Sequence, residues 1–293
     1  MNWNKKSLKI FLLLMLAPMG SHFAQNAITI KGSDTMVLLG QRWAEVYMKK
    51  NPAARIQVTG GGSGTGIAAL INGTTDICEA SRPMKDKEKE EVKTKRNAAV
   101  VEIPVAVDGL AIYLNSVNPI KELTLEQIKG IYTGKITNWK DVGGKAGMII
   151  AYSRENNSGT YAYFKEHVLG NADFYPTIQT LPGTSAVTNA VAKDPKSIGY
   201  GGIAYAKGIH HAMVKKDADS PAVEPSMENV LSGKYPISRY LYWYTAGEPT
   251  GEMKKVVDWV LGHEGQKLVQ EVGYYPLPKK GEDSPGAVKK KAK

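Results

Sequence analysis

The sequence contains a single cysteine, and beyond its first two dozen residues it has no apolar stretch long enough to cross a membrane. Cys78 alone cannot form an intramolecular disulfide, and we expect its side chain to be buried without a chemical role. Because no cysteine follows the apolar run near the start, a lipid anchor is not expected either. With 42% hydrophobic and 23% charged residues, the chain can nevertheless bury a sizeable core.

The sequence also lacks the patterns that mark common hydrolytic and metal-dependent active sites. It has no H-E-x-x-H motif and no G-x-S-x-G elbow, and its five histidines are scattered. His210 and His211 are adjacent, so in a strand they would face opposite sides and could not both ligate one metal ion. We therefore predict a protein that is not an enzyme and needs neither a metal nor another cofactor.

The net charge of +10 is concentrated at the two ends of the chain. Lys5, Lys6 and Lys9 contribute +3 and residues 279–293 contribute +4, which leaves +3 for residues 25–278. The central part has no basic stripe interleaved with aromatic residues, so nucleic acid is not expected as a partner. We interpret the lysine-rich residues 279–293 as a basic, disordered tail.

Residues 1–24 have the pattern of a secretory signal peptide. Three lysines precede an apolar run from Ile10 to Met19, well short of the ~20 residues that a membrane-spanning helix needs. A secreted chain with neither a disulfide nor a lipid anchor fits the periplasm. We therefore predict a periplasmic protein that is released by cleavage of this signal.

Short β-rich runs alternate with helical periodicity through most of the chain. Four predicted strands each precede a polar turn: residues 28–31, 55–59, 76–80 and 148–152. This alternation indicates an α/β fold with mainly parallel strands, and 293 residues favour two lobes. Residues 100–107 and 109–114 are predicted to be two extended segments that meet at Asp108 and Gly109 in a crossover. Residues 237–245 form a further predicted strand.

Each of the four strands leads into a turn rich in hydroxyl side chains or glycine. These turns are Gly32 to Thr35, Gly60 to Gly66, Ala80 to Pro83 and Ser153 to Thr160. Open α/β sheets bind ligands at the carboxyl ends of their strands, where such turns lie. For the first turn taken alone, helix capping is the better interpretation. The second turn is neither a P-loop nor a dinucleotide fingerprint, and its glycines favour close approach of the backbone to a ligand.

The fourth turn combines Arg154 with a segment from Ser158 to Thr160 that opens a predicted helix. A helix start presents free backbone N–H groups and a partial positive charge, which suit a small anion. The arginine adds a planar fork of donors that matches a tetrahedral oxyanion. Together the turns supply seven candidate donor side chains for one buried oxyanion: Ser33, Thr35, Ser63, Ser81, Arg154, Ser158 and Thr160.

These turns, in this order, resemble those of the phosphate-binding proteins of bacterial phosphate ABC transporters. The similarity covers roughly residues 28–278. Its most specific parts are Lys31 to Met36, Gly62 to Gly66, Ile131 to Trp139 and Arg154 to Thr160, and Ser197 to Tyr200 is similar to a later family signature. The resemblance implies the two-lobed periplasmic-binding-protein fold of type II, in which each lobe is a mainly parallel sheet flanked by helices and crossover strands form the hinge.

The resemblance also implies a division of the chain and a function. Lobe 1 is expected at residues 25–106 and 233–278, and lobe 2 at residues 107–232. The expected oxyanion contacts are Thr35, Ser63, Arg154, Ser158, Gly159 and Thr160. The implied function is capture of inorganic phosphate by a monomer, which delivers it to an ABC permease in the inner membrane.

Two positions depart from the family pattern. Family members best known for excluding sulfate use an aspartate in the third turn and another near the arginine. This sequence has Ser81 and Asn156 at these positions, and both are candidate phosphate contacts. We hypothesise that Asp34 supplies the missing acceptor for the proton of hydrogen phosphate, with helix capping as its alternative role. Another oxyanion, such as sulfate or molybdate, is therefore an alternative ligand.

Two further functions stay open at this point. One is a secreted phosphate-ester hydrolase with Ser63 or Ser158 as nucleophile, although no base is evident near either serine. The other is a free-standing scavenger or signalling protein that has no permease.

Overall fold

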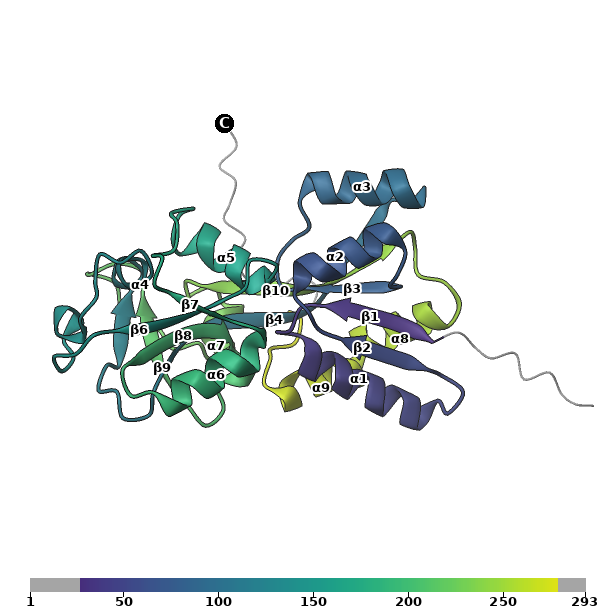
Figure 1. Ribbon diagram of the computed structural model, residues 1–293. Coiled ribbons are helices and arrows are strands. Elements are labelled where there is room, and N and C mark those ends of the chain that lie inside the picture. Colours follow the sequence, from purple (N-terminus) through teal and green to yellow (C-terminus); the bar gives the residue numbers. More distant parts are fainter. Residues whose placement is uncertain (1–26, 279–293) are drawn as a thin grey trace, which may run out of the picture.

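The first strand–turn–helix units build one half of the molecule, called lobe 1 below. In the computed structural model, which describes residues 27–278, three parallel strands are neighbours: β1 (Ile28–Gly32), β2 (Ile56–Thr59) and β3 (Ile77–Ala80). Among the described residues, five helices belong to this half (Figure 1): α1 (Val37–Lys50), α2 (Ser63–Asn72), α3 (Asp86–Arg96), α8 (Gly251–Leu261) and α9 (His263–Val272). The predicted signal peptide and basic tail lie outside the described residues.

The other half, lobe 2, is built around β6 (Ile150–Arg154), which pairs in parallel with β7 (Gln179–Leu181) and β8 (Ser197–Gly202). Two further strands pair in parallel beside this sheet, β5 (Glu122–Thr124) and β9 (His210–Lys215). The helices of lobe 2 are α4 (Leu125–Tyr132), α5 (Gly159–His167), α6 (Gly183–Lys193) and α7 (Met227–Leu231), with short 3₁₀ turns at Trp139–Val142 and Ile203–Tyr205. The predicted capping box at Thr124 is present at the start of α4.

Two long strands pass from one lobe to the other (Figure 1). β4 (Val100–Leu114) and β10 (Ser238–Ala246) pair antiparallel and join both halves into one sheet, ordered β2-β1-β3-β10-β4-β8-β6-β7 across residues 27–278. The predicted crossover at Asp108 and Gly109 is present, but its predicted division into two extended segments is wrong, because Asp108 lies inside the continuous strand β4, opposite Arg239 of β10. A buried charge interrupts the apolar pattern there without interrupting the strand.

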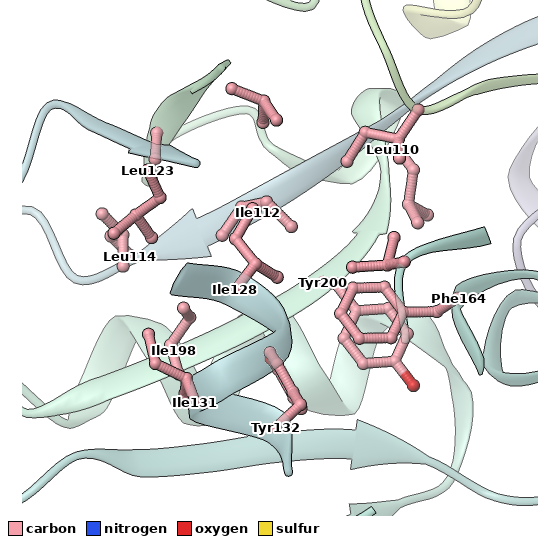
Figure 2. Close-up of a cluster of buried hydrophobic side chains, with 14 of the residues drawn as sticks. Leu110, Ile112, Leu114, Leu123, Ile128, Ile131, Tyr132, Phe164, Ile198 and Tyr200 are labelled. Carbon is pink, nitrogen blue, oxygen red and sulfur yellow. The ribbon is translucent and has the colours of Figure 1, made fainter. Parts of the chain in front are cut away.

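Each lobe has its own hydrophobic core. In lobe 2, Ile112, Tyr132 and Tyr200 pack with Phe164, whose ring stacks on that of Tyr200 at 3.8 Å (Figure 2). In lobe 1, the helices bury apolar side chains such as Trp43 against the sheet. Cys78 is buried in a smaller cluster beneath α2, as predicted.

The two-lobed α/β architecture is as predicted, and the residue boundaries of the lobes stay a prediction. Tyr235 and Ile237, which the sequence analysis assigns to lobe 1, contribute to the core of lobe 2. None of the helices within residues 27–278 combines the length and the apolar composition needed to cross a membrane.

Glu79 is a fully buried carboxylic acid in β3. Trp243 Nε1 donates a hydrogen bond to its Oε1 at 3.0 Å, whereas Oε2 has no hydrogen-bond partner within residues 27–278. Burial raises the pKa of Glu79 from 4.5 to about 8, because the charged form loses its hydration. The folded protein therefore holds a proton there at neutral pH that the unfolded chain releases.

This burial predicts a pH-dependent stability. The raised pKa means that the contribution of protonated Glu79 is fully present below pH 4.5 and is lost as the pH rises toward 8. The slope is at most about 1.4 kcal/mol per pH unit. Glu79→Gln should remove this slope, so urea unfolding at pH 5 and pH 8 should show a smaller stability loss than in the wild type. Glu126 is exposed, so the control Glu126→Gln should keep the wild-type dependence of stability on pH. The same pH dependence in Glu79→Gln as in the wild type would contradict the prediction.

Candidate functional site

The four polar turns predicted from the sequence meet where the two lobes face each other. The Ser33 hydroxyl donates to Ser81 Oγ at 2.9 Å, and Ser63 Oγ lies 3.4 Å from Ser81 Oγ. Thr35 Oγ1 lies 2.8 Å from Thr160 Oγ1, which is also 3.5 Å from Ser81 Oγ. All five side chains are buried. These residues (Ser33, Thr35, Ser63, Ser81 and Thr160) are called the hydroxyl cluster below.

The first turn is held tightly against β3. Gly32 has a φ of +149°, and a Cβ there would overlap the carbonyl oxygen of Glu79. The Ser33 N–H donates to that same carbonyl at 2.9 Å. Helix α1 starts after Met36, and no side chain caps it. The helix-capping interpretation of this turn, including the capping role of Asp34, is therefore wrong, and its polar side chains bond to other turns instead.

Asp34 and Arg154 form an ion pair between the lobes. Arg154 Nη2 donates to Asp34 Oδ2 at 2.8 Å. The backbone N–H of Gly61 donates to Asp34 Oδ1, also at 2.8 Å. Asp34 thus connects the first, second and fourth turns through one carboxylate.

Arg154 is almost completely buried at the end of β6. Its Nη1 donates to Thr184 Oγ1 at 2.7 Å, but its buried Nε has no hydrogen-bond partner within residues 27–278. Burial lowers the pKa of Arg154, and the neighbouring Asp34 carboxylate opposes this effect. A buried N–H group without an acceptor carries a free-energy cost, which an oxygen of a bound anion would remove. The surroundings of Arg154 therefore favour binding of an anion.

Two helices begin at the hydroxyl cluster. Helix α5 begins at Gly159, as predicted, and its N-cap Ser158 accepts hydrogen bonds from the N–H groups of Thr160 and Tyr161 at 3.2 and 3.3 Å. Helix α2 begins at Ser63, and no side chain caps it. The positive ends of both helix dipoles therefore lie at the same cluster.

The glycine turn of lobe 1 approaches the fourth turn of lobe 2 through its backbone. The Gly64 N–H donates to the carbonyl of Asn157 at 2.8 Å, and Asn157 Nδ2 donates to the carbonyl of Gly61 at 3.0 Å. A Cβ at Gly62, where φ is +89°, would lie 2.8 Å from the Asn157 carbonyl oxygen. The glycines thus permit close approach of the opposite lobe, which the sequence analysis did not anticipate.

Asn156 is the predicted site residue whose side chain lies at the surface. It borders a surface pocket of about 400 Å³ that Arg154 and Tyr161 also line. Its neighbour Asn157 makes the contacts between the lobes instead. Turn geometry decides which of two consecutive asparagines faces the other lobe, and sequence alone does not show it.

Sequence reasoning missed a second buried ion pair at the site, Arg239 with Asp108. Arg239 Nη2 lies 2.9 Å from Asp108 Oδ2 and donates to Thr160 Oγ1 at 3.0 Å. The available signal was one charged residue within each of two otherwise uncharged runs, Asp108 within residues 103–114 and Arg239 within residues 238–246. Such charges are rarely buried without a partner.

The arrangement is suited to binding rather than to nucleophilic catalysis. Within residues 27–278, no imidazole or carboxylate forms a hydrogen bond with a hydroxyl of the cluster. The same residues contain no group of three His, Cys, Asp or Glu side chains that could hold a metal ion. The site instead offers neutral hydroxyl donors, two arginines and two helix starts, which are the donors that a small oxyanion requires.

The sequence matches the PBP superfamily domain over residues 19–264. It is 35% identical over 266 residues to the phosphate-binding protein PstS of Pseudomonas aeruginosa, and the alignment covers 85% of this chain and 82% of that protein. The phosphate-binding protein PstS of Bacillus subtilis is 36% identical over 259 residues, with 88% of this chain and 83% of that protein covered.

Solved structures give the same relationship. A substrate-binding protein from Clostridium perfringens with bound phosphate has a TM-score of 0.78 and 32% identity, covering 86% of this chain and 100% of that one. An ABC-type phosphate transport receptor from Vibrio cholerae has a TM-score of 0.68 and 30% identity, with the same coverage of 86% and 100%. The predicted two-lobed periplasmic-binding fold is therefore confirmed.

The packing at Gly159 predicts that this residue controls how closely the lobes approach. A Cβ there would overlap Ser63 Oγ and would lie 2.8 Å from Ser81 Oγ and 2.9 Å from Ser63 Cβ, so rotation of a hydroxyl alone does not relieve it. Gly159→Ala should cost about 1–3 kcal/mol of stability or hold the lobes apart. Small-angle X-ray scattering should then show a larger radius of gyration than in the wild type. Gly147→Ala is the matched control, because its Cβ would meet nothing within 4 Å. Wild-type stability and dimensions in Gly159→Ala would contradict the prediction.

Proposed function

Because this chain belongs to the phosphate-binding proteins of the PBP superfamily, we propose that it captures inorganic phosphate between its two lobes for import. Proteins of this family are solute-binding components of transporters and not enzymes. Family membership therefore confirms the prediction of a binding protein and removes the support for a phosphate-ester hydrolase.

The observation that carries the proposal is the buried Arg154 guanidinium. It pairs with Asp34, which lies between Ser33 and Thr35 of the hydroxyl cluster, and one of its N–H groups has no partner within residues 27–278. A phosphate oxygen at this guanidinium would accept a charge-assisted hydrogen bond from that N–H. On binding, the hydroxyls of the cluster would give up the hydrogen bonds among themselves and donate to the other phosphate oxygens. Because these hydroxyls are buried, the site suits a small inorganic oxyanion better than a phosphate ester, whose substituent would need an opening.

The proposed ligand contacts are the residues expected from the sequence, apart from one. Ser33, Thr35, Ser63 and Ser81 would act from lobe 1, together with the acceptor Asp34. Arg154, Ser158, Gly159 and Thr160 would act from lobe 2. For Ser158 and Gly159 the contribution would be the start of α5, because the Ser158 hydroxyl caps that helix. Asn156, which is exposed, has no support as a direct contact.

Ligand contacts from both lobes would favour the closed form over an open one. The closed form would dock on an ABC permease in the inner membrane, as the transporter context of the Vibrio cholerae relative suggests. PstS-type proteins are periplasmic in Gram-negative bacteria, and the signal-like residues 1–24 support this location for the present chain. We propose that it acts there as a monomer.

Replacement of Arg154 tests the function directly. Arg154→Gln should weaken phosphate binding by about 100-fold, since hydrogen bonds from charged groups contribute roughly 1.5–3 kcal/mol each. Isothermal titration calorimetry of the purified protein with phosphate, sulfate and molybdate measures this loss and identifies the preferred anion. Arg42→Gln, which breaks an ion pair with Glu45 within helix α1, is the matched control and should bind as the wild type does. Wild-type affinity in Arg154→Gln would exclude the proposed site.

Asp34 is the proposed acceptor for the proton of hydrogen phosphate. Sulfate carries no such proton, so a carboxylate facing it would be left unpaired. Asp34→Asn should reduce the ratio of phosphate affinity to sulfate affinity by about 10-fold. This ratio is the informative quantity, because loss of the ion pair with Arg154 changes the binding of both anions. An unchanged ratio of phosphate affinity to sulfate affinity would contradict the role of Asp34 as the proton acceptor.

A further inference from the structure

Arg239 and Asp108 occupy opposite positions on the two crossing strands, β10 and β4. Asp108 has no exposed surface and Arg239 is 4% exposed. Arg239 Nε and Nη2 donate to Asp108 Oδ2 at 3.1 and 2.9 Å. The backbone N–H of Ile203 in lobe 2 donates to Asp108 Oδ1 at 3.0 Å. The plane of the guanidinium is therefore fixed by Asp108, which faces Arg239 across the paired strands.

The remaining donors of Arg239 reach the binding site from the hinge. Nη1 donates to the carbonyl of Ser81, in the third turn of lobe 1, at 2.8 Å. Nη2 donates to Thr160 Oγ1, at the start of α5 in lobe 2, at 3.0 Å. One side chain of the crossing strands thus contacts a proposed ligand turn from each lobe.

We propose that Arg239 is a positioning residue that makes the Thr160 hydroxyl a dedicated donor to the bound oxyanion. This inference rests on the proposed function. A guanidinium can only donate, so its bond to Thr160 Oγ1 occupies an oxygen lone pair. The hydroxyl hydrogen must then point away from Arg239, toward Thr35 Oγ1, Ser81 Oγ or an oxygen of the anion. Arg239 thereby sets the direction of the hydrogen bond without touching the ligand.

The role differs from that proposed for Asp34. A hydroxyl fixed as a donor serves any oxyanion whose oxygen can accept, so Arg239 should affect phosphate and sulfate binding equally. Asp34, by contrast, should affect their ratio. Asp108 is needed because it holds the guanidinium plane and compensates its charge.

A double-mutant cycle tests the coupling between Arg239 and Thr160. Asp108→Asn combined with Arg239→Gln replaces the buried ion pair by neutral amides and leaves no unpaired charge. We expect this replacement to weaken phosphate binding by about 10-fold with Thr160 present, and by less than about threefold in a Thr160→Val background. Titration with sulfate should show a similar loss, so that the phosphate-to-sulfate ratio stays at the wild-type value.

Arg239→Lys provides a second route if the double replacement does not fold, and thermal unfolding monitors each variant. Lysine keeps the charge but cannot donate in one plane to Asp108, Ser81 and Thr160 together, so a similar loss with the same dependence on Thr160 is expected. Equal losses with and without the Thr160→Val substitution, or no loss at all, would overturn the role of Arg239 while leaving phosphate binding intact. Failure of the wild-type protein to bind any of the oxyanions would overturn the proposed function as well.

Discussion

The burial of two guanidinium groups between the lobes is the constraint on which the rest of the structure depends. Removing an ion from water costs several kcal/mol, so each arginine needs a partner with good geometry. Arg239 receives Asp108 from the neighbouring strand of the same ladder, and that pair forms whenever the sheet forms. Arg154 receives Asp34 from the opposite lobe. The charge of Arg154 is therefore compensated by Asp34 only when the two lobes are closed.

The pairing of each arginine with one aspartate explains why the rest of the site is made of neutral groups. A further positively charged side chain near the anion would need a further negatively charged partner. Hydroxyls and helix starts stabilise negative charge without adding a full positive charge, and hydroxyls can bond to one another when the lobes meet. The direct contacts within the hydroxyl cluster, such as Thr35 with Thr160, show this second property.

The sequence predicted the parts of the site that depend on local structure. Polar turns after strands, the helix start at Gly159 and the capping box at Thr124 follow from neighbouring residues alone. The missed contacts all depend on register or on closure. Arg239 meets Asp108 only because residues 131 positions apart are paired. Asp34 precedes helix α1 without capping it and binds Arg154 and Gly61 instead. The charge of Asp108 within an apolar run predicted a break between two strands. It instead pairs with Arg239, another buried charge.

The hydrogen bonds at the site indicate which group could distinguish phosphate from sulfate. Discrimination requires an acceptor for one proton, and Ser81 replaces the aspartate that the family pattern places in the third turn. Ser81 Oγ already accepts from the Ser33 hydroxyl, and its backbone carbonyl accepts from Arg239. Asp108 is occupied on both oxygens by Arg239 and Ile203. Asp34 also has one donor on each oxygen, but its donors are an arginine that would bind the anion and a backbone group at the glycine turn. Of the two carboxylates at the site, only Asp34 shares its arginine with the proposed ligand, so a proton on the anion would meet a carboxylate there and not at the hinge.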